Sequence, residues 1–350
     1  MRVSMAGLCG TDYRIWSGDR PVTYPRILGH EFVGRIEAVG RDVRHLGVGQ
    51  RVAAEPNYSC GHCALCREGN RNLCARRTAI GIDVDGAFAE LVRLPARCCW
   101  PVADSVPDDQ AVMAEPLAVV VRAVNRGAPK PGESAAVVGA GTLGLLALQV
   151  LFASDARVLV VSRSPRRFEL AESLGAAGAH AFADGPLDAA ARRFSGREGV
   201  DLVVETAGTA EAVNHAVALV RPGGRVVLTG LPHEATTLSF FPVVRHEITI
   251  LGSMIYQDEF PQALRLLETG RVRTRSLLTH CFALGAIDEA FAAHRAPASI
   301  KVAVIPQGTT CHGLRDHQRD PDALRGRRSR SPGAPHRRAL DAGCRLGAAS

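Results

Sequence analysis

Four cysteines lie within fifteen residues of this 350-residue chain, at a spacing that suits a single zinc ion. They are Cys60, Cys63, Cys66 and Cys74. Zinc prefers four ligands at tetrahedral corners, and two-residue spacers bring successive sulfurs back to one point. Two disulfides are the alternative, but the first residues do not form a secretory signal segment, so a reducing cytoplasm is expected. The spacing therefore predicts a structural zinc site.

A glycine-rich segment, GAGTLG at 139–144, has the spacing of a dinucleotide-binding turn. A short apolar strand is predicted before it, over 135–138, and a helix after it, over 143–152. The first glycine permits a tight turn, the second lets a pyrophosphate approach the backbone, and the third lets helix and strand pack closely. A turn that binds nothing is the alternative. The candidate cofactor-binding residues of this segment are Gly139, Gly141, Thr142, Leu143 and Gly144.

Neither hydropathy nor charge indicates a membrane or a nucleic acid as partner. The uncharged window 134–154 is long enough to cross a membrane, but its three central glycines would each cost about 1 kcal/mol in a continuous helix. The formal net charge is +7, and residues 307–350 supply +5 of it through nine arginines and four aspartates. Because the rest of the chain is nearly balanced, it has no basic surface of the kind that binds nucleic acid.

Predicted strands and helices alternate after the glycine-rich segment, which indicates a parallel sheet covered by helices on both faces. The chain before it consists of short segments broken by glycines and is predicted to be β-rich. A helix over 262–268 and a strand over 300–305 are expected to close the ordered part, and residues 307–350 are expected to be disordered. The alternating strands are predicted at 157–161, 180–182, 201–205, 225–229 and 248–251, and the helices at 166–174, 187–194 and 210–220.

A third group of residues is scattered along the chain: Cys9 in CGTD, His30 in GHE and Glu115 in EPL. A cysteine, a histidine and a carboxylate that leave one position open are typical of a catalytic zinc site. A lone histidine or cysteine is more often structural, so these residues alone leave both interpretations open.

In this order the motifs resemble those of the zinc-dependent medium-chain alcohol dehydrogenases, over residues 3 to about 306. The resemblance rests on CGTD at 9–12, YPRILGHEFVGRIEAVG at 24–40, the four-cysteine loop, EPLAV at 115–119 and GAGTLG at 139–144. It implies an α/β protein with a β-rich GroES-like catalytic domain and a Rossmann domain whose parallel sheet is doubly wound. The implied domains are 1–116 (catalytic), 117–259 (Rossmann) and 260–306 (return to the catalytic domain), followed by the tail 307–350. Relatives usually carry some tens of residues before CGTD, so opening strands are expected to be missing.

The resemblance also implies an activity, which is hydride transfer between a nicotinamide cofactor and a secondary alcohol or ketone. By position, Cys9, His30 and Glu115 match the catalytic zinc ligands, and Glu31 matches a carboxylate that binds the zinc directly in some members. Simple alcohol dehydrogenases have a cysteine at the position of Glu115. The glutamate therefore favours a polyol, an amino alcohol or a cyclitol as substrate.

Three further residues receive roles from the resemblance. Asp12 would hold the ring of His30, and Thr11 would pass the substrate's hydroxyl proton outward. Many relatives continue this proton path with a histidine three positions after the threonine, where this chain has Arg14. Because arginine stays protonated, the path beyond Thr11 is expected to use the cofactor ribose and water.

The choice of cofactor is expected to depend on the end of the second Rossmann strand. Ser162 occupies the place where an acidic residue would bind the ribose hydroxyls of NAD. Arg163, with Arg166 or Arg167, could meet a 2′-phosphate, which favours NADP over NAD. Solvated arginines at the start of a helix are the alternative.

The expected assembly is a cytoplasmic homodimer or homotetramer that holds one catalytic and one structural zinc per chain and acts on a small alcohol or ketone. Two alternatives remain. One is a catalytically impaired, zinc- and nucleotide-binding remnant of the family, and the other is a simple-alcohol dehydrogenase. The complete set of four candidate catalytic-site residues argues against a quinone reductase, since that type lacks zinc.

Overall fold

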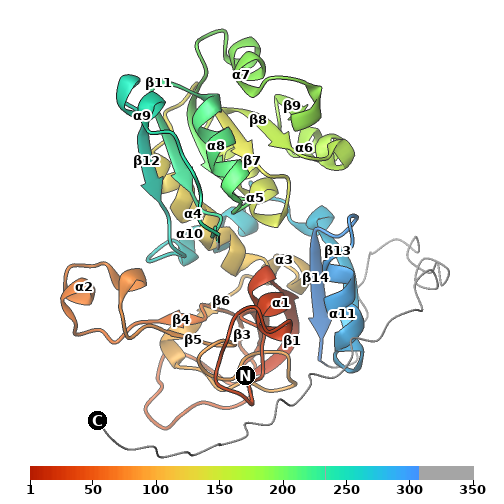
Figure 1. Ribbon diagram of the computed structural model, residues 1–350. Coiled ribbons are helices and arrows are strands. Elements are labelled where there is room, and N and C mark those ends of the chain that lie inside the picture. The colour runs from red at the N-terminus through yellow and green to blue at the C-terminus, as the bar shows by residue number, and fades with distance from the viewer. Residues whose placement is uncertain (233, 307–350) are drawn as a thin grey trace, which may run out of the picture. The chain divides into compact units, whose positions relative to one another are not determined.

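The computed structural model describes residues 1–232 and 234–306 (Figure 1). Two six-stranded sheets organise this part of the chain. No helix within it combines the length and the apolar character that a membrane span needs. The predicted disordered tail lies outside the described residues.

The first sheet is formed by the two ends of the described chain. Strand β1 lies between β2 and β14 and pairs antiparallel with both, while β13 pairs parallel with β14. The last strand of the described residues is therefore a direct neighbour of their first strand. The strand order is β13 (Leu278–Ala283), β14 (Lys301–Ile305), β1 (Arg2–Leu8), β2 (Glu31–Arg35), β3 (Arg51–Ala54) and β6 (Cys99–Pro101).

The second sheet is parallel throughout, and its strands are apolar because helices cover both faces. Side chains of α4, α5 and α10 share one core with β7, while those of α7 and α8 share another core on its other face. The predicted doubly wound sheet is confirmed (Figure 1). The strand order is β12 (Thr249–Gly252), β11 (Val220–Leu228), β10 (Val200–Glu205), β7 (Ser134–Val138), β8 (Arg157–Ser162) and β9 (Gly178–Ala181).

The helices that pack against the two sheets vary from single turns to fourteen residues. The α-helices outside the cysteine loop are α1 (Gly10–Trp16), α3 (Asp108–Ala111), α4 (Ala114–Gly127), α5 (Thr142–Ala153), α6 (Phe168–Ser173), α7 (Leu187–Ser195), α8 (Ala210–Leu219), α9 (Phe241–Arg245), α10 (Phe260–Glu268) and α11 (Ile287–His294). The 3₁₀ turns there are η2 (Ala96–Cys98), η3 (Pro165–Arg167), η4 (Phe182–Asp184), η5 (Arg275–Leu277) and η6 (Leu284–Ala286).

The four-cysteine loop is an excursion between two very short strands, β4 (Asn57–Tyr58) and β5 (Thr78–Ala79). These strands pair antiparallel and close the loop at its base. The loop itself contains one helical turn, α2 (Ala64–Arg67), and the 3₁₀ turn η1 (Arg71–Leu73). Figure 1 shows it projecting beside the first sheet.

Among the elements that were not predicted from the sequence are helix α4, strand β13 and helix α11, and one prediction was too simple. Strand β13 and helix α11 were missed because their polar residues interrupt the apolar pattern. The helix predicted over 166–174 is instead the 3₁₀ turn η3, which begins at Pro165, followed by α6. Neither difference alters the doubly wound topology.

Candidate active site and metal centres

Helix α1 begins directly after Cys9, and Asp12 in its first turn contacts both Cys9 and His30. One carboxylate oxygen of Asp12 accepts the Cys9 backbone N–H at 2.9 Å, and the other lies 3.1 Å from His30 Nδ1. Asp12 has no exposed surface. Because an ionised carboxylate can only accept, Nδ1 of His30 must donate, so Nε2 is the ring nitrogen through which a metal would bind.

The side chains of Cys9, His30 and Glu31 converge. Their potential ligand atoms all lie within 4.8 Å of one another. They line a cleft of about 630 Å³, together with Glu115 from the first turn of α4 and Thr11 from α1. All the predicted metal-binding and proton-transfer residues thus line one cleft, but the carboxylate in the converging group is that of Glu31, and Glu115 lies outside that group. The thiol, imidazole and carboxylate groups fit a zinc ion.

Glu115 is buried, and its surroundings favour the protonated carboxyl group. Burial raises the pKa of Glu115 to about 7. The charge of His30 lowers this pKa, and the charge of Glu31 raises it. A divalent cation in this cleft would reverse the preference, since it would hold the carboxylate ionised.

Lys301 is a functional candidate that the sequence reasoning missed. It is almost fully buried at the start of β14, forms an ion pair with Glu31 and donates to the Leu8 carbonyl at 3.3 Å. A lysine at the head of an otherwise apolar strand was the available signal, because a buried charge needs a partner. The pair fixes one oxygen of Glu31 beside the cleft.

His294, at the end of α11, also lines the cleft and was missed. Burial, and then the positive charge of Lys301, lower the pKa of His294 to about 4, so the ring is neutral at physiological pH. No sequence signal could have placed it here, because it lies nearly the whole described chain away from Thr11. Arg14 lines the same cleft.

The glycine-rich turn has the geometry that its predicted role requires. Gly139 has φ +105°, which favours glycine, and a Cβ on Gly144 would overlap the carbonyl oxygen of Gly139. A Cβ on Gly141 would meet no atom of the described residues within 4 Å, so the space beside it is open. Gly141 precedes the first turn of α5, whose N–H groups are free to bind an anion.

The other two predicted residues of this turn differ in what they contact. Leu143 lines the cleft. The hydroxyl of Thr142 donates to the Ile300 carbonyl at 2.7 Å, so it ties the turn to the segment that leads into β14. Both residues lie at the point where the strand order reverses between β7 and its two neighbours, which is where open parallel sheets bind ligands.

The residues predicted to choose the cofactor lie at the end of β8. Ser162 is half-buried, and Arg163 and Arg166 are exposed. Arg167 donates to the carbonyls of Ala140 and Ser299, so its guanidinium group is already used within the chain. Of the three arginines, Arg163 and Arg166 have the side chains that are free to turn toward a phosphate.

The four loop cysteines form a second candidate metal centre. Their sulfurs lie within 4.8 Å of one another, with 3.4 Å between Cys63 and Cys66 and 3.5 Å between Cys74 and Cys60. These separations exceed a disulfide bond of about 2.05 Å. They are close to the edge of about 3.8 Å that four sulfurs have around a zinc at about 2.3 Å. The geometry favours a metal over disulfides.

Comparison with known proteins gives two family matches. The family described as "Alcohol dehydrogenase GroES-like domain" matches residues 1–104, and that described as "Zinc-binding dehydrogenase" matches residues 142–269. D-arabinitol dehydrogenase 1 from Uromyces fabae is 32% identical to this chain over 313 residues, which cover 87% of this chain and 89% of that protein.

Two solved structures are similar over nearly the whole described chain. A zinc-binding dehydrogenase from Sinorhizobium meliloti 1021, bound to NADP, has a TM-score of 0.84 and 34% identity, covering 87% of this chain and 91% of that one. The alcohol dehydrogenase RspB from Escherichia coli CFT073, complexed with NADH, has a TM-score of 0.81 and 32% identity, covering 87% and 90%. The resemblance predicted from the motifs is confirmed.

Proposed function

This chain belongs to the zinc-dependent medium-chain alcohol dehydrogenase family, and we propose that it oxidises a polyol or related secondary alcohol, with NADP as its preferred cofactor. It is an NAD(P)-dependent oxidoreductase that acts on small alcohols and ketones. One observation carries the proposal: the candidate zinc ligands and the dinucleotide-binding turn line the same cleft.

The proposed catalytic metal ligands are Cys9, His30 and Glu115, with Glu31 beside them. A zinc ion held there would act as a Lewis acid toward the substrate oxygen. Asp12 keeps Nε2 of His30 directed to the metal position. Glu31 is paired with Lys301, whereas Glu115 has no ion pair among the described residues, which supports Glu115 as the carboxylate ligand.

Proton transfer is assigned to Thr11, whose side chain lines the cleft. Its hydroxyl can accept the proton of the substrate hydroxyl while it donates its own proton, so one group both accepts and passes on a proton. Arg14 cannot accept that proton. The neutral ring of His294 lines the same cleft and is able to accept it.

The NADP preference is supported by the residues after β8. Ser162 carries no charge that would repel a 2′-phosphate, and the side chains of Arg163 and Arg166 are exposed beside it. Similar proteins have been solved with either NADP or NADH, so this preference is a property of the individual chain. Measuring kcat/KM with both cofactors tests it, and a value for NAD equal to or above that for NADP would refute it.

The polyol preference is supported by Glu115 and by the similarity to a D-arabinitol dehydrogenase. A panel of polyols, amino alcohols, cyclitols and simple secondary alcohols, followed by cofactor absorbance, tests it. We expect the highest kcat/KM for a polyol or a close relative. If only simple alcohols are oxidised, the simple-alcohol alternative is right. If none is oxidised and each chain holds one zinc, the impaired remnant is right.

The proposal extends to the assembly and the compartment. We propose a homodimer or homotetramer in the cytoplasm, because this is the usual arrangement that the resemblance implies. Sedimentation equilibrium of the purified protein tests the assembly, and a monomer at micromolar concentration would contradict it.

A further inference from the structure

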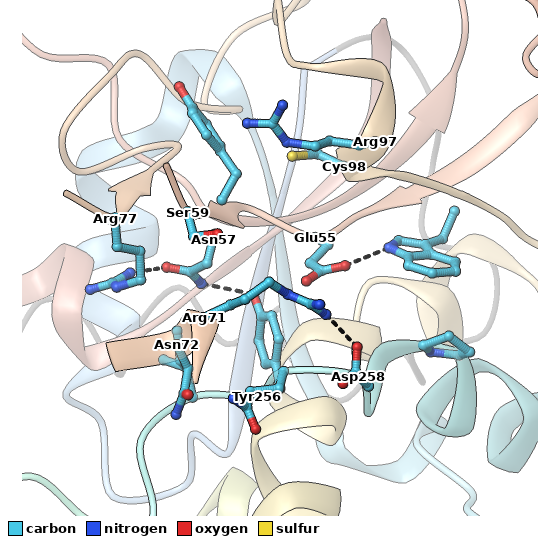
Figure 2. A pocket seen from close by; sticks show the side chains of 15 residues that line it. Glu55, Asn57, Ser59, Arg71, Asn72, Arg77, Arg97, Cys98, Tyr256 and Asp258 are labelled. Carbon is cyan, nitrogen blue, oxygen red and sulfur yellow. Dashed lines mark hydrogen bonds and ion pairs between the residues drawn. The ribbon is translucent and has the colours of Figure 1, made fainter. Parts of the chain in front are cut away.

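Tyr256 connects the candidate catalytic centre to a second pocket of about 330 Å³, shown in Figure 2. Its hydroxyl accepts a hydrogen bond of 2.8 Å from Asn57 Nδ2, and the Glu115 carboxylate is its other polar neighbour. Asn57 Oδ1 in turn accepts from Arg77. Arg77, Asn57 and Tyr256 therefore form a continuous series of hydrogen bonds that ends beside the Glu115 carboxylate.

The direction of every bond in this series is fixed by its first member. Arg77 can only donate, so the Asn57 amide must turn its oxygen toward Arg77. The amide nitrogen then faces Tyr256 and donates to its hydroxyl. The hydroxyl proton of Tyr256 is consequently directed toward Glu115. Its orientation depends on Asn57 and, through Asn57, on Arg77.

Arg77 and Asn57, the first two members of this hydrogen-bonded series, belong to the base of the cysteine loop. Asn57 is the first residue of β4, three positions before Cys60. Arg77 directly precedes β5 and donates its backbone N–H to the Cys74 carbonyl at 3.0 Å. A metal bound by the four cysteines would therefore fix the two ends from which Asn57 and Arg77 project.

The loop also holds the segment that carries Tyr256. Asn72 is buried and donates its side-chain amide to the Met254 carbonyl at 2.9 Å. Arg71 pairs with Asp258, as Figure 2 shows. Tyr256 thus lies between two contacts of its own segment with the cysteine loop.

This segment needs such support because its backbone is strained. Ile255, next to Tyr256, has φ +41°, which is rare for a β-branched residue. Strain of this kind persists only where the surroundings enforce it. Ile255 also lines both the catalytic cleft and the second pocket, so the strained residue lies where the two meet.

We propose that the cysteine loop positions the metal ligand Glu115 through Arg77, Asn57 and Tyr256, so that the loop controls how firmly the catalytic centre holds its metal. Tyr256 and Asn57 are positioning residues in this inference, since neither is proposed as a ligand. The inference rests on the proposed function, because it takes Glu115 to be a ligand of a catalytic zinc.

The test is the release of zinc from the purified full-length protein to an excess of a chelator, with zinc per chain counted at each time. In Tyr256→Phe, one of the two zinc ions should leave about 10 to 100 times faster than in the parent, which is the usual effect of losing an outer partner of a metal ligand. The other zinc, in the cysteine loop, should remain. Tyr58→Phe is the matched control, because Tyr58 lines the same pocket and its hydroxyl makes no hydrogen bond to the described residues. It should behave as the parent.

Asn57→Asp separates positioning from simple electrostatics. It replaces the donor that faces Tyr256 with an acceptor, so the Tyr256 proton turns away from Glu115 and zinc release should accelerate as in Tyr256→Phe. A purely electrostatic role predicts the opposite, because an added negative charge retains a cation better.

The inference is overturned if the parent holds two zinc ions and Tyr256→Phe releases both at the parent's rates. Slower release from Asn57→Asp would overturn it as well. A parent protein that binds zinc only at the four cysteines would instead refute the proposed function. The two failures are thus distinguishable.

Discussion

At the scale of single residues, the candidate site depends on partners that the metal would not touch. Asp12 shows this most clearly, because its two oxygens hold both the Cys9 backbone and the His30 ring. The sequence predicted the role of Asp12 through the resemblance. It could not reveal Lys301 or His294, since only the pairing of β14 with β1 and the packing of α11 bring them to the cleft.

Replacing Asp12 with asparagine tests this dependence. Asp12→Asn weakens the acceptor that orients His30, so the affinity for the catalytic zinc should fall by about 10- to 100-fold. Competition with a chromophoric chelator measures it. Asp19→Asn, an exposed change on the same part of the chain, should leave the affinity unaltered. Equal affinities in the two variants would show that Asp12 does not orient the ligand.

Arg163 is the residue on which the cofactor preference is expected to depend. Arg163→Ala removes a charge that can meet the 2′-phosphate, so kcat/KM with NADP should fall about tenfold while that with NAD stays the same. The exposed Arg193 on α7 provides the control substitution Arg193→Ala. A parallel fall with both cofactors would mean that Arg163 does not select between them.

At the scale of elements, the alternation of apolar strands and helices was sufficient to predict the Rossmann sheet and the turn between β7 and α5. It was not sufficient for β13 and α11, whose alternation is interrupted by polar residues such as His280. The pairing of β13 with β14 depends on contacts between distant parts of the sequence, and periodicity within one window does not report those.

Substitutions at two glycines of the turn are expected to separate effects on folding from effects on cofactor binding. Gly144→Ala would place a methyl group against the Gly139 carbonyl, so we expect a loss of about 1–3 kcal/mol in the free energy of unfolding. Gly141→Ala meets no described atom and should fold normally, but its methyl group would occupy the space expected for the pyrophosphate. Urea unfolding and cofactor titration distinguish the two. Normal cofactor affinity in Gly141→Ala would contradict the assigned phosphate position.

Asp201 links three strands at the end opposite the candidate site. Burial alone would raise the pKa of Asp201, but hydrogen bonds from Arg221 and Ser134 lower this pKa to about 2. Its unfolded pKa is about 3.9, so its contribution to stability is complete above about pH 4 and is lost as the pH falls through about 2. Asp201→Asn should therefore cost about 2 kcal/mol at pH 7 and much less near pH 2. A cost that does not vary with pH would contradict this.

At the scale of the whole molecule, the first sheet, the doubly wound sheet and the cysteine loop all contribute to a single centre. The first sheet supplies Glu31 and Lys301, the second supplies the dinucleotide-binding turn, and the base of the loop supplies the hydrogen bonds to Tyr256, which lies beside Glu115. The sequence motifs predicted the members of this arrangement. The connection from loop to centre became visible only in the folded chain, because it runs through Asn57 and Tyr256, which belong to no motif.

The central claim is that one of two zinc ions performs the chemistry at Cys9, His30 and Glu115. The most direct measurement is NADP-dependent polyol oxidation, recorded against zinc per chain while a chelator removes the more labile ion. We predict that turnover falls in proportion as zinc declines from two to one per chain and that added zinc restores it. Full turnover by protein that retains only the zinc of the cysteine loop would contradict the account.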